Sequence, residues 1–162
     1  MKTIILFVCF LLILILSSCW EKEGYEFRWV NNANYDIIMH SEYYGAAHIY
    51  PDTLFNIENL IDRPIGILVK ANTDQRQFLH ERLEDVIHRT PKDTLSFFYF
   101  HADTVNKYSL KILQRDYKIL QRYDLSSQDV ITLKDRYGRP EIPYPPDTRM
   151  KDMKMYPPYG SY

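Results

Sequence analysis

The run from Leu95 to Phe100 constrains the fold more than any other stretch of this sequence. Its six residues read Leu-Ser-Phe-Phe-Tyr-Phe, so aromatic side chains occupy both of its alternating faces. Aromatic residues are enriched in strands, and a strand that is apolar on both faces has to be covered on both faces. We therefore predict a central strand at Leu95–Phe100, in the middle of the hydrophobic core.

Other segments have the pattern of shorter strands. Aromatic residues occupy every second position from Tyr25 to Trp29, with charged residues between them, as is typical of a half-buried strand. The asparagine-rich segment 31–34 tolerates a tight turn, and residues 35–39 resume an extended pattern, which predicts a β-hairpin. Two further strands are predicted at residues 54–57 and 65–69.

Three helices are predicted. The longest covers residues 73–89, because Leu79, Leu83, Val86 and Ile87 form an apolar stripe at helical spacing. The other two are a short helix over residues 109–115, followed by a strand over 117–123, and a helix that starts at Ser126, with Asp129 completing a capping box. An Ile-Leu pair recurs after seven residues within 111–124, but two copies fall short of the three or four heptads that a coiled coil requires.

The C-terminal segment is rich in proline and tyrosine. Proline removes backbone donors, so this segment is not expected to supply a central strand. Two interpretations of residues 145–162 stay open: the tail packs on its own domain, or it is a docking peptide for a partner. The elements together predict a mainly β fold, with α+β as the variant: a single antiparallel β-sandwich-like domain over residues 25–144 with two or three short helices and the tail packed on it.

Residues 1–18 have the features of a signal peptide. Lys2 precedes an apolar run from Thr3 to Leu16, which is shorter than the roughly 20 residues that span a bilayer. The order Leu-Ser-Ser-Cys at residues 16–19 resembles the bacterial lipobox, and this resemblance implies cleavage before Cys19. It also implies that Cys19 carries a diacylglycerol and a fatty acyl chain such as palmitate. The alternative, a buried strand or helix with an incidental cysteine, would need burial on all sides.

Processing at Cys19 determines where the mature chain resides. Residues 19–24 form a short lipidated tether, so we expect the protein in the bacterial cell envelope, at the outer membrane, with the periplasmic or surface face left open. Removal of the leader with its one lysine changes the net charge of −1 to −2, which indicates neither a nucleic-acid partner nor binding to an anionic membrane face. Cys9 leaves with the leader, so the folded part is expected to contain no disulfide and no thiolate metal site.

Two groups of residues were weighed as chemical sites. His80, Glu84 and His88 recur every four residues, but His80 and His88 would lie about 12 Å apart along a helix, too far to share one metal ion. His101 and Asp103 can be read as an acid–base pair, or as an Asx turn beside an exposed histidine. We predict no catalytic residue, metal or cofactor, and keep an envelope hydrolase that uses the His101/Asp103 region as the alternative.

Three motifs in the C-terminal third carry a resemblance: RYDLS at residues 122–126, YPP at 144–146 and MKMYPPYG at 153–160. Together with the lipobox they resemble a family of small uncharacterised lipoproteins of gut Gram-negative anaerobes. This resemblance implies a membrane-anchored envelope protein and transfers no activity. We therefore expect a non-enzymatic binding or structural module, anchored through Cys19, whose partner is an envelope protein or a glycan.

Overall fold

The structure, a computed structural model, describes residues 24–41 and 66–161. The predicted leader, the predicted lipidation site Cys19 and the predicted strand at 54–57 lie outside the described residues. The described strands are β1 (Tyr25–Asn31), β2 (Ile37–Ser41), β3 (Ile67–Val69), β4 (Thr73–Leu79), β5 (Thr94–His101), β6 (Gln121–Ser126), β7 (Glu141–Tyr144) and β8 (Lys154–Tyr156). The described helices are α2 (Leu83–His88), α3 (Ala102–Lys107), α4 (Leu110–Arg115) and α5 (Ser127–Thr132), with 3-10 turns η2 (Pro91–Asp93) and η3 (Thr148–Met150).

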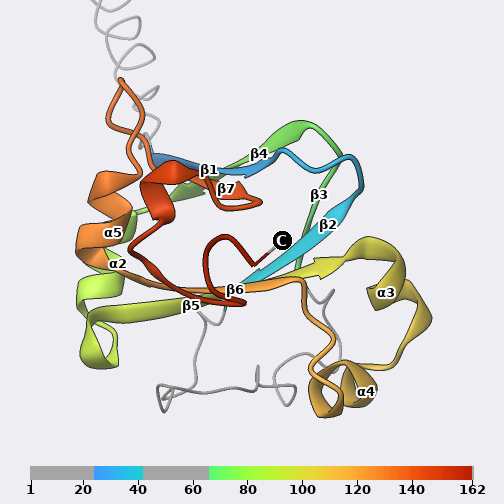
Figure 1. Ribbon diagram of the computed structural model, residues 1–162. Coiled ribbons are helices and arrows are strands. Elements are labelled where there is room, and N and C mark those ends of the chain that lie inside the picture. Colours follow the sequence, from blue (N-terminus) through green and yellow to red (C-terminus); the bar gives the residue numbers. More distant parts are fainter. Residues whose placement is uncertain (1–23, 42–65, 162) are drawn as a thin grey trace, which may run out of the picture.

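Two sheets pack face to face (Figure 1). The larger has the strand order β3-β2-β5-β6-β8 and is antiparallel throughout. The smaller has the order β4-β1-β7, in which β1 pairs antiparallel with β4 and parallel with β7. Helices α2 and α5 contact each other at one end of the two layers, and α3 and α4 extend from the other end (Figure 1). This arrangement confirms the prediction of a mainly β, sandwich-like fold.

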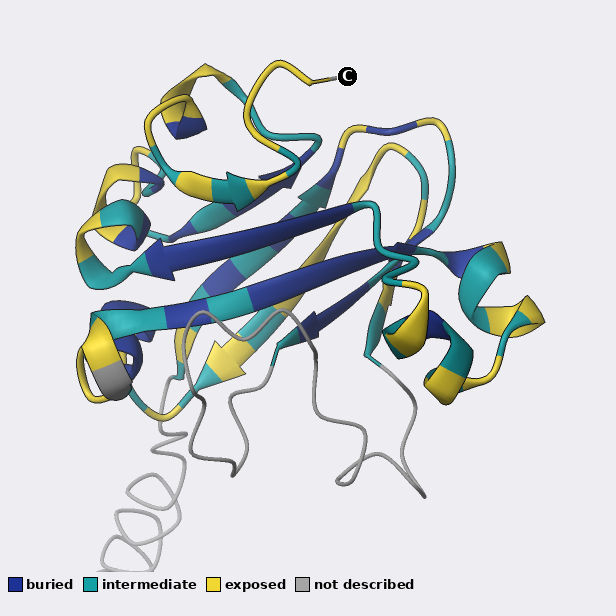
Figure 2. Ribbon diagram, turned by 60° about the horizontal axis from the view of Figure 1, so that its bottom comes forward, coloured by how far each residue is buried: buried dark blue, intermediate teal, exposed yellow. Residues whose placement is uncertain are grey.

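Strand β5 is the middle strand of the larger sheet, as predicted from its aromatic sequence. Leu95, Phe97 and Tyr99 face the core between the sheets, whereas Phe98 and Phe100 pack with Leu113 of α4 on the other face. Figure 2 shows β5 and its neighbour β6 as buried along most of their lengths. Both faces of the aromatic run are therefore covered.

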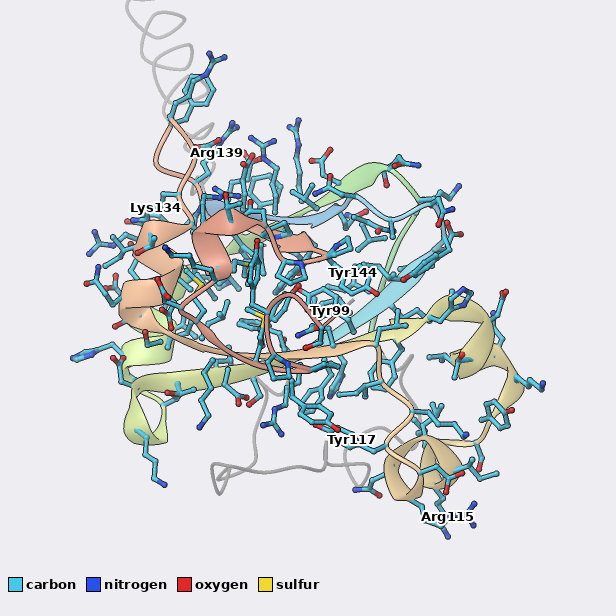
Figure 3. The ribbon with its side chains drawn as sticks, viewed as in Figure 1. Tyr99, Arg115, Tyr117, Lys134, Arg139 and Tyr144 are labelled. Carbon is cyan, nitrogen blue, oxygen red and sulfur yellow. The ribbon has the colours of Figure 1, made fainter. Side chains whose placement is uncertain are left out.

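Aromatic rings fill the space between the sheets. Trp29 of β1 meets Phe97 of β5 edge to face, with ring centroids 5.0 Å apart. Tyr99 of β5 stacks on Tyr144 of β7 at 5.4 Å, and Figure 3 shows these two tyrosines facing each other in the interior. The Tyr144 hydroxyl is 2.8 Å from that of Tyr35, so it is hydrogen-bonded inside the core. Because edge-to-face and offset stacked pairs add to the free energy gained by burial, these rings hold the two sheets together.

The predicted β-hairpin of residues 25–39 is wrong. Both strands exist, but β1 lies in the smaller sheet and β2 in the larger one, so the chain changes layers between them. The buried Asn31 side chain explains the crossing, because its amide donates to the carbonyl oxygens of Tyr35 (2.8 Å) and Val69 (3.1 Å). A tight turn would have left this amide facing solvent.

The predicted helix over residues 73–89 is also wrong in its first half. Residues 73–79 form β4, which pairs with β1 over its whole length, and only Leu83–His88 is helical. Asn72 begins the strand from a left-handed conformation (φ 54°). Pairing with β1 satisfies a full row of backbone groups, so tertiary context overrides the local helical pattern. Leu83, Val86 and Ile87 of the predicted stripe are buried on α2 as expected.

The second half of the chain follows the predictions more closely. Helix α4 begins after Ser109 as predicted, and Ser126 and Asp129 form both hydrogen bonds of the capping box of α5. The predicted strand at 117–123 begins only at Gln121, because Tyr117 adopts a left-handed conformation (φ 47°) in the turn after α4. Helix α3 was not predicted.

The C-terminal segment lies against the domain. Strand β7 is at the edge of the smaller sheet, where Pro143 is tolerated, and β8 pairs with β6 at the edge of the larger one. Met150 is fully buried in the core, and the Gln121 side chain donates to the carbonyl oxygen of Pro157 (2.8 Å). Across the described ranges, no helix is long and apolar enough to cross a membrane.

Candidate functional site

His101 and Asp103 do not form an acid–base pair. The Nδ1 atom of His101 accepts a hydrogen bond from the backbone N–H of Asp103 (3.2 Å), so the imidazole caps α3. The same ring stacks on Tyr35 at 4.8 Å. The Asp103 carboxylate lies 4.0 Å from Nδ1 and points into solvent. This histidine therefore has a structural role that the Asx-turn interpretation did not include.

The fold places His80 outside the helix that carries Glu84 and His88. His80 follows β4, outside α2, whereas Glu84 is buried on α2 and accepts a hydrogen bond from Lys134 Nζ at 2.6 Å. His88 is exposed and lies 3.3 Å from Asp93. Within residues 24–41 and 66–161, no group of histidine, cysteine or acidic residues is placed to hold a metal ion.

The structure instead has a cleft at the end of the domain where β1 begins. It is lined by the first residues of β1, the start of α2 and the segment between α5 and β7: residues 24–27, 82–84, 134 and 137–140. Its volume of about 220 Å³ is below the roughly 300–1,000 Å³ of typical small-molecule sites. The small volume of the cleft therefore favours a surface that binds a partner through its side chains. It does not favour a pocket that encloses a substrate.

Ion pairs connect the elements around this cleft. Arg28 of β1 lies within 3.1 Å of Asp135, 3.3 Å of Glu141 and 3.5 Å of Glu26. Arg139 contacts Asp135 at 2.7 Å and Glu26 at 3.4 Å. These five residues come from β1, β7 and the segment that joins α5 to β7, so the network fixes that segment against the smaller sheet.

Asp135 organises the tight loop that we call the Tyr137 loop, residues Asp135–Arg139. Its Oδ1 accepts hydrogen bonds from the backbone N–H groups of Tyr137 (2.8 Å) and Arg139 (2.9 Å). Gly138 supplies the left-handed conformation (φ 78°) that closes the turn. Burial would raise the pKa of Asp135, but the hydrogen bonds from Arg139 and Tyr137 outweigh it and lower the pKa to about 2. Asp135 is thus a permanent anion that holds the loop in shape.

The Tyr137 loop presents an aromatic side chain to solvent. The Tyr137 ring lies between two guanidinium groups, with Arg136 at 4.7 Å and Arg139 at 4.8 Å from its centroid. Figure 3 shows Arg139 at the base of this loop. Tyrosine and arginine dominate the energetic centres of binding interfaces, and a preformed loop loses little entropy on binding. The arrangement is suited to recognition and supplies no activated nucleophile.

The Tyr137 loop was not predicted from the sequence. The available signal was an aspartate followed at two to four residues by tyrosine, glycine and arginine, which is typical of an Asx-type turn.

A second polar cluster lies within the larger sheet. Arg122 and Asp124 of β6 are both buried, with Arg122 Nη2 and Asp124 Oδ2 3.1 Å apart. Ser96 of β5 donates to the other Asp124 oxygen at 2.6 Å, and Tyr117 lies 3.2 Å from Arg122 Nη1. Burial raises the pKa of Tyr117, against the lowering effect of the Arg122 charge. All four side chains hydrogen-bond within the cluster, which indicates a structural role in the sheet.

Asp135→Asn is expected to lower the free energy of unfolding at pH 7 by at most about 2 kcal/mol, because a pKa depressed from 3.8 to about 2 stabilises the fold by that amount. This contribution is complete above pH 4 and is lost as the pH falls toward 2. Urea unfolding from pH 7 to pH 2 measures it. Asp152→Asn, at an exposed aspartate, should have no effect. A constant difference between Asp135→Asn and the unchanged protein at all pH values would contradict the assignment.

Comparison with known proteins found no match: no protein-family model, no curated protein and no solved structure matches this chain. Its function is therefore inferred from its own residues and contacts.

Proposed function

We propose that this protein is a lipoprotein of the bacterial cell envelope, anchored by a lipid on Cys19, which acts as a non-enzymatic binding or structural module. The observation that carries the proposal is the lipobox-like Leu-Ser-Ser-Cys at residues 16–19, followed after five residues by the first described strand at Tyr25. A short tether between lipid and domain fits an anchored module. Two or three acyl chains suffice for stable attachment, whereas one does not.

The contacts of the charged residues support a binding role over a hydrolase. His101 caps a helix and stacks on Tyr35, so its ring is committed to the fold. Asp135 holds the backbone of its own loop, and Glu84 accepts a hydrogen bond from Lys134, so both carboxylates have structural contacts. The feature that this end of the domain offers to a partner is the exposed, preorganised Tyr137 ring.

Cys19→Ala is expected to abolish incorporation of labelled palmitate, because it removes the only thiol after the predicted cleavage site. Cys9→Ala is the matched control and should label normally, since Cys9 leaves with the leader. The chain beginning at Trp20 should fold and remain in the aqueous phase of a detergent partition, because residues 20–162 contain no cysteine that could pair with Cys19. Normal labelling of Cys19→Ala, or labelling lost equally in Cys9→Ala, would refute the lipid assignment.

A further inference from the structure

We propose that the Tyr137 loop is the surface through which the domain contacts the membrane that anchors it, with anionic phospholipid headgroups as its ligand. This inference rests on the proposed lipid at Cys19. It adds an orientation: the end of the domain that carries the Tyr137 loop faces the bilayer.

The tether restricts where the membrane can lie. Gly24 is five positions after Cys19, so the two are at most about 17 Å apart even when the chain is fully extended. Gly24 lines the same cleft as Tyr137, Gly138 and Arg139. In Figure 1 the segment between α5 and β7 projects beyond the sheets at the end where β1 begins. A lipid on Cys19 therefore brings this end of the domain to the headgroups.

Exposed aromatic side chains gather at this end. Tyr25 is 51% exposed and Tyr137 65% exposed, and both line the cleft with Gly24. Phe78 of β4, 64% exposed, lies directly beside Gly24. Tyrosine is enriched at membrane–water interfaces, where its ring sits at the level of the headgroups and its hydroxyl remains hydrated. These three rings surround the point where the tether enters the domain.

Two acidic side chains at this end, Glu26 and Glu84, are only 17% and 9% exposed. The Arg82 side chain is 55% exposed, but its Nε lies 2.8 Å from the carboxylate of Asp85, which is 47% exposed, so this pair adds no net charge. Arg136 is exposed on the loop itself, stacked on Tyr137. One guanidinium group can donate hydrogen bonds to two phosphate oxygens at once. Each basic residue near an anionic leaflet contributes about 1 kcal/mol to membrane binding, or about fivefold in the binding equilibrium. The loop therefore offers a ring for the interface and an arginine for a phosphate.

A single-site label tests this contact in the lipidated full-length protein. The folded part has no cysteine, so Tyr137→Cys creates one site for an environment-sensitive fluorophore. Asp103→Cys, at an exposed residue of α3 at the opposite end of the domain, is the matched control. Both proteins are reconstituted into vesicles of phosphatidylethanolamine and phosphatidylglycerol in a 3:1 ratio. We expect the label at 137 to shift to the blue and to be quenched by brominated lipid, and the label at 103 to do neither.

A second variant tests the charge. In the protein labelled at 137, Arg136→Ala should reduce the ratio of membrane-contacting to free loop by about fivefold. Arg115→Ala, at an exposed arginine of α4, should leave the ratio unchanged. Replacing the anionic vesicles by vesicles of phosphatidylcholine should reduce the ratio of membrane-contacting to free loop as much as Arg136→Ala does.

The outcomes separate the two proposals. If the protein floats with the vesicles but the label at 137 stays in water, as the label at 103 does, the membrane contact is refuted and the lipid anchor stands. If the label at 137 is shielded from water in intact cells but not on vesicles, the membrane contact is also refuted. The loop would then bind a protein or a glycan. If the protein does not float with the vesicles, the lipid anchor itself fails.

Discussion

Asp124→Ala is expected to lower the free energy of unfolding by about 3–5 kcal/mol, because it leaves the buried Arg122 charge without its carboxylate. The Ser96 hydroxyl loses its acceptor at the same time. Domains are stable by only about 5–15 kcal/mol, so much of the protein should be unfolded in mild denaturant. Urea unfolding of the chain beginning at Trp20, followed by circular dichroism, measures the change.

The double variant Arg122→Met with Asp124→Leu is the control for Asp124→Ala. A buried ion pair replaced by apolar side chains of similar volume is often neutral, because both desolvation costs disappear together. We expect this variant to be within about 1 kcal/mol of the unchanged protein. If it is as unstable as Asp124→Ala, the loss comes from packing, and the unpaired charge is not its cause.

Trp29→Ala is expected to lower the free energy of unfolding by about 3–5 kcal/mol, because it removes a fully buried ring from between the sheets. The ring contacts Phe27 at 5.1 Å and Phe97 at 5.0 Å, and so joins β1 to β5. Phe78→Ala removes an exposed ring from the neighbouring β4 and should change stability by no more than about 0.5 kcal/mol. Equal effects of the two substitutions would contradict the placement of Trp29 in the core.

The sequence predicts best those elements whose local pattern matches their place in the fold. The aromatic run at Leu95–Phe100 needs cover on both faces, and the smaller sheet covers one face while α4 covers the other. The capping box of Ser126 and Asp129 is complete within four residues, so no distant partner is needed to recognise it. For the same reason α4 begins where Ser109 predicts.

The errors arise where a distant partner decides the structure. The apolar stripe that predicted a helix begins only at Leu79, and β1 pairs with every residue of the segment 73–79. Likewise the asparagines after β1 tolerate a hairpin turn, but the buried Asn31 amide binds carbonyl groups of another segment and carries the chain to the second sheet. Neither contact can be read from local periodicity.

The local sequence pattern did not predict the candidate site for a related reason. His101 and Asp103 drew attention because their side chains can do acid–base chemistry, yet they act through a backbone cap. Asp135 of the Tyr137 loop likewise binds backbone N–H groups, and the character of the loop depends on the exposure of Tyr137 and on its position beside Gly24. Both properties are tertiary.

The lipid on Cys19 is tested most directly by the mass of the N-terminal peptide of the mature protein, purified from membranes. We predict a peptide that begins at Cys19 and carries the added mass of a diacylglycerol and one acyl chain. A mature chain that begins at another residue, or a Cys19 with an unmodified thiol, would contradict both the anchor and the orientation derived from it.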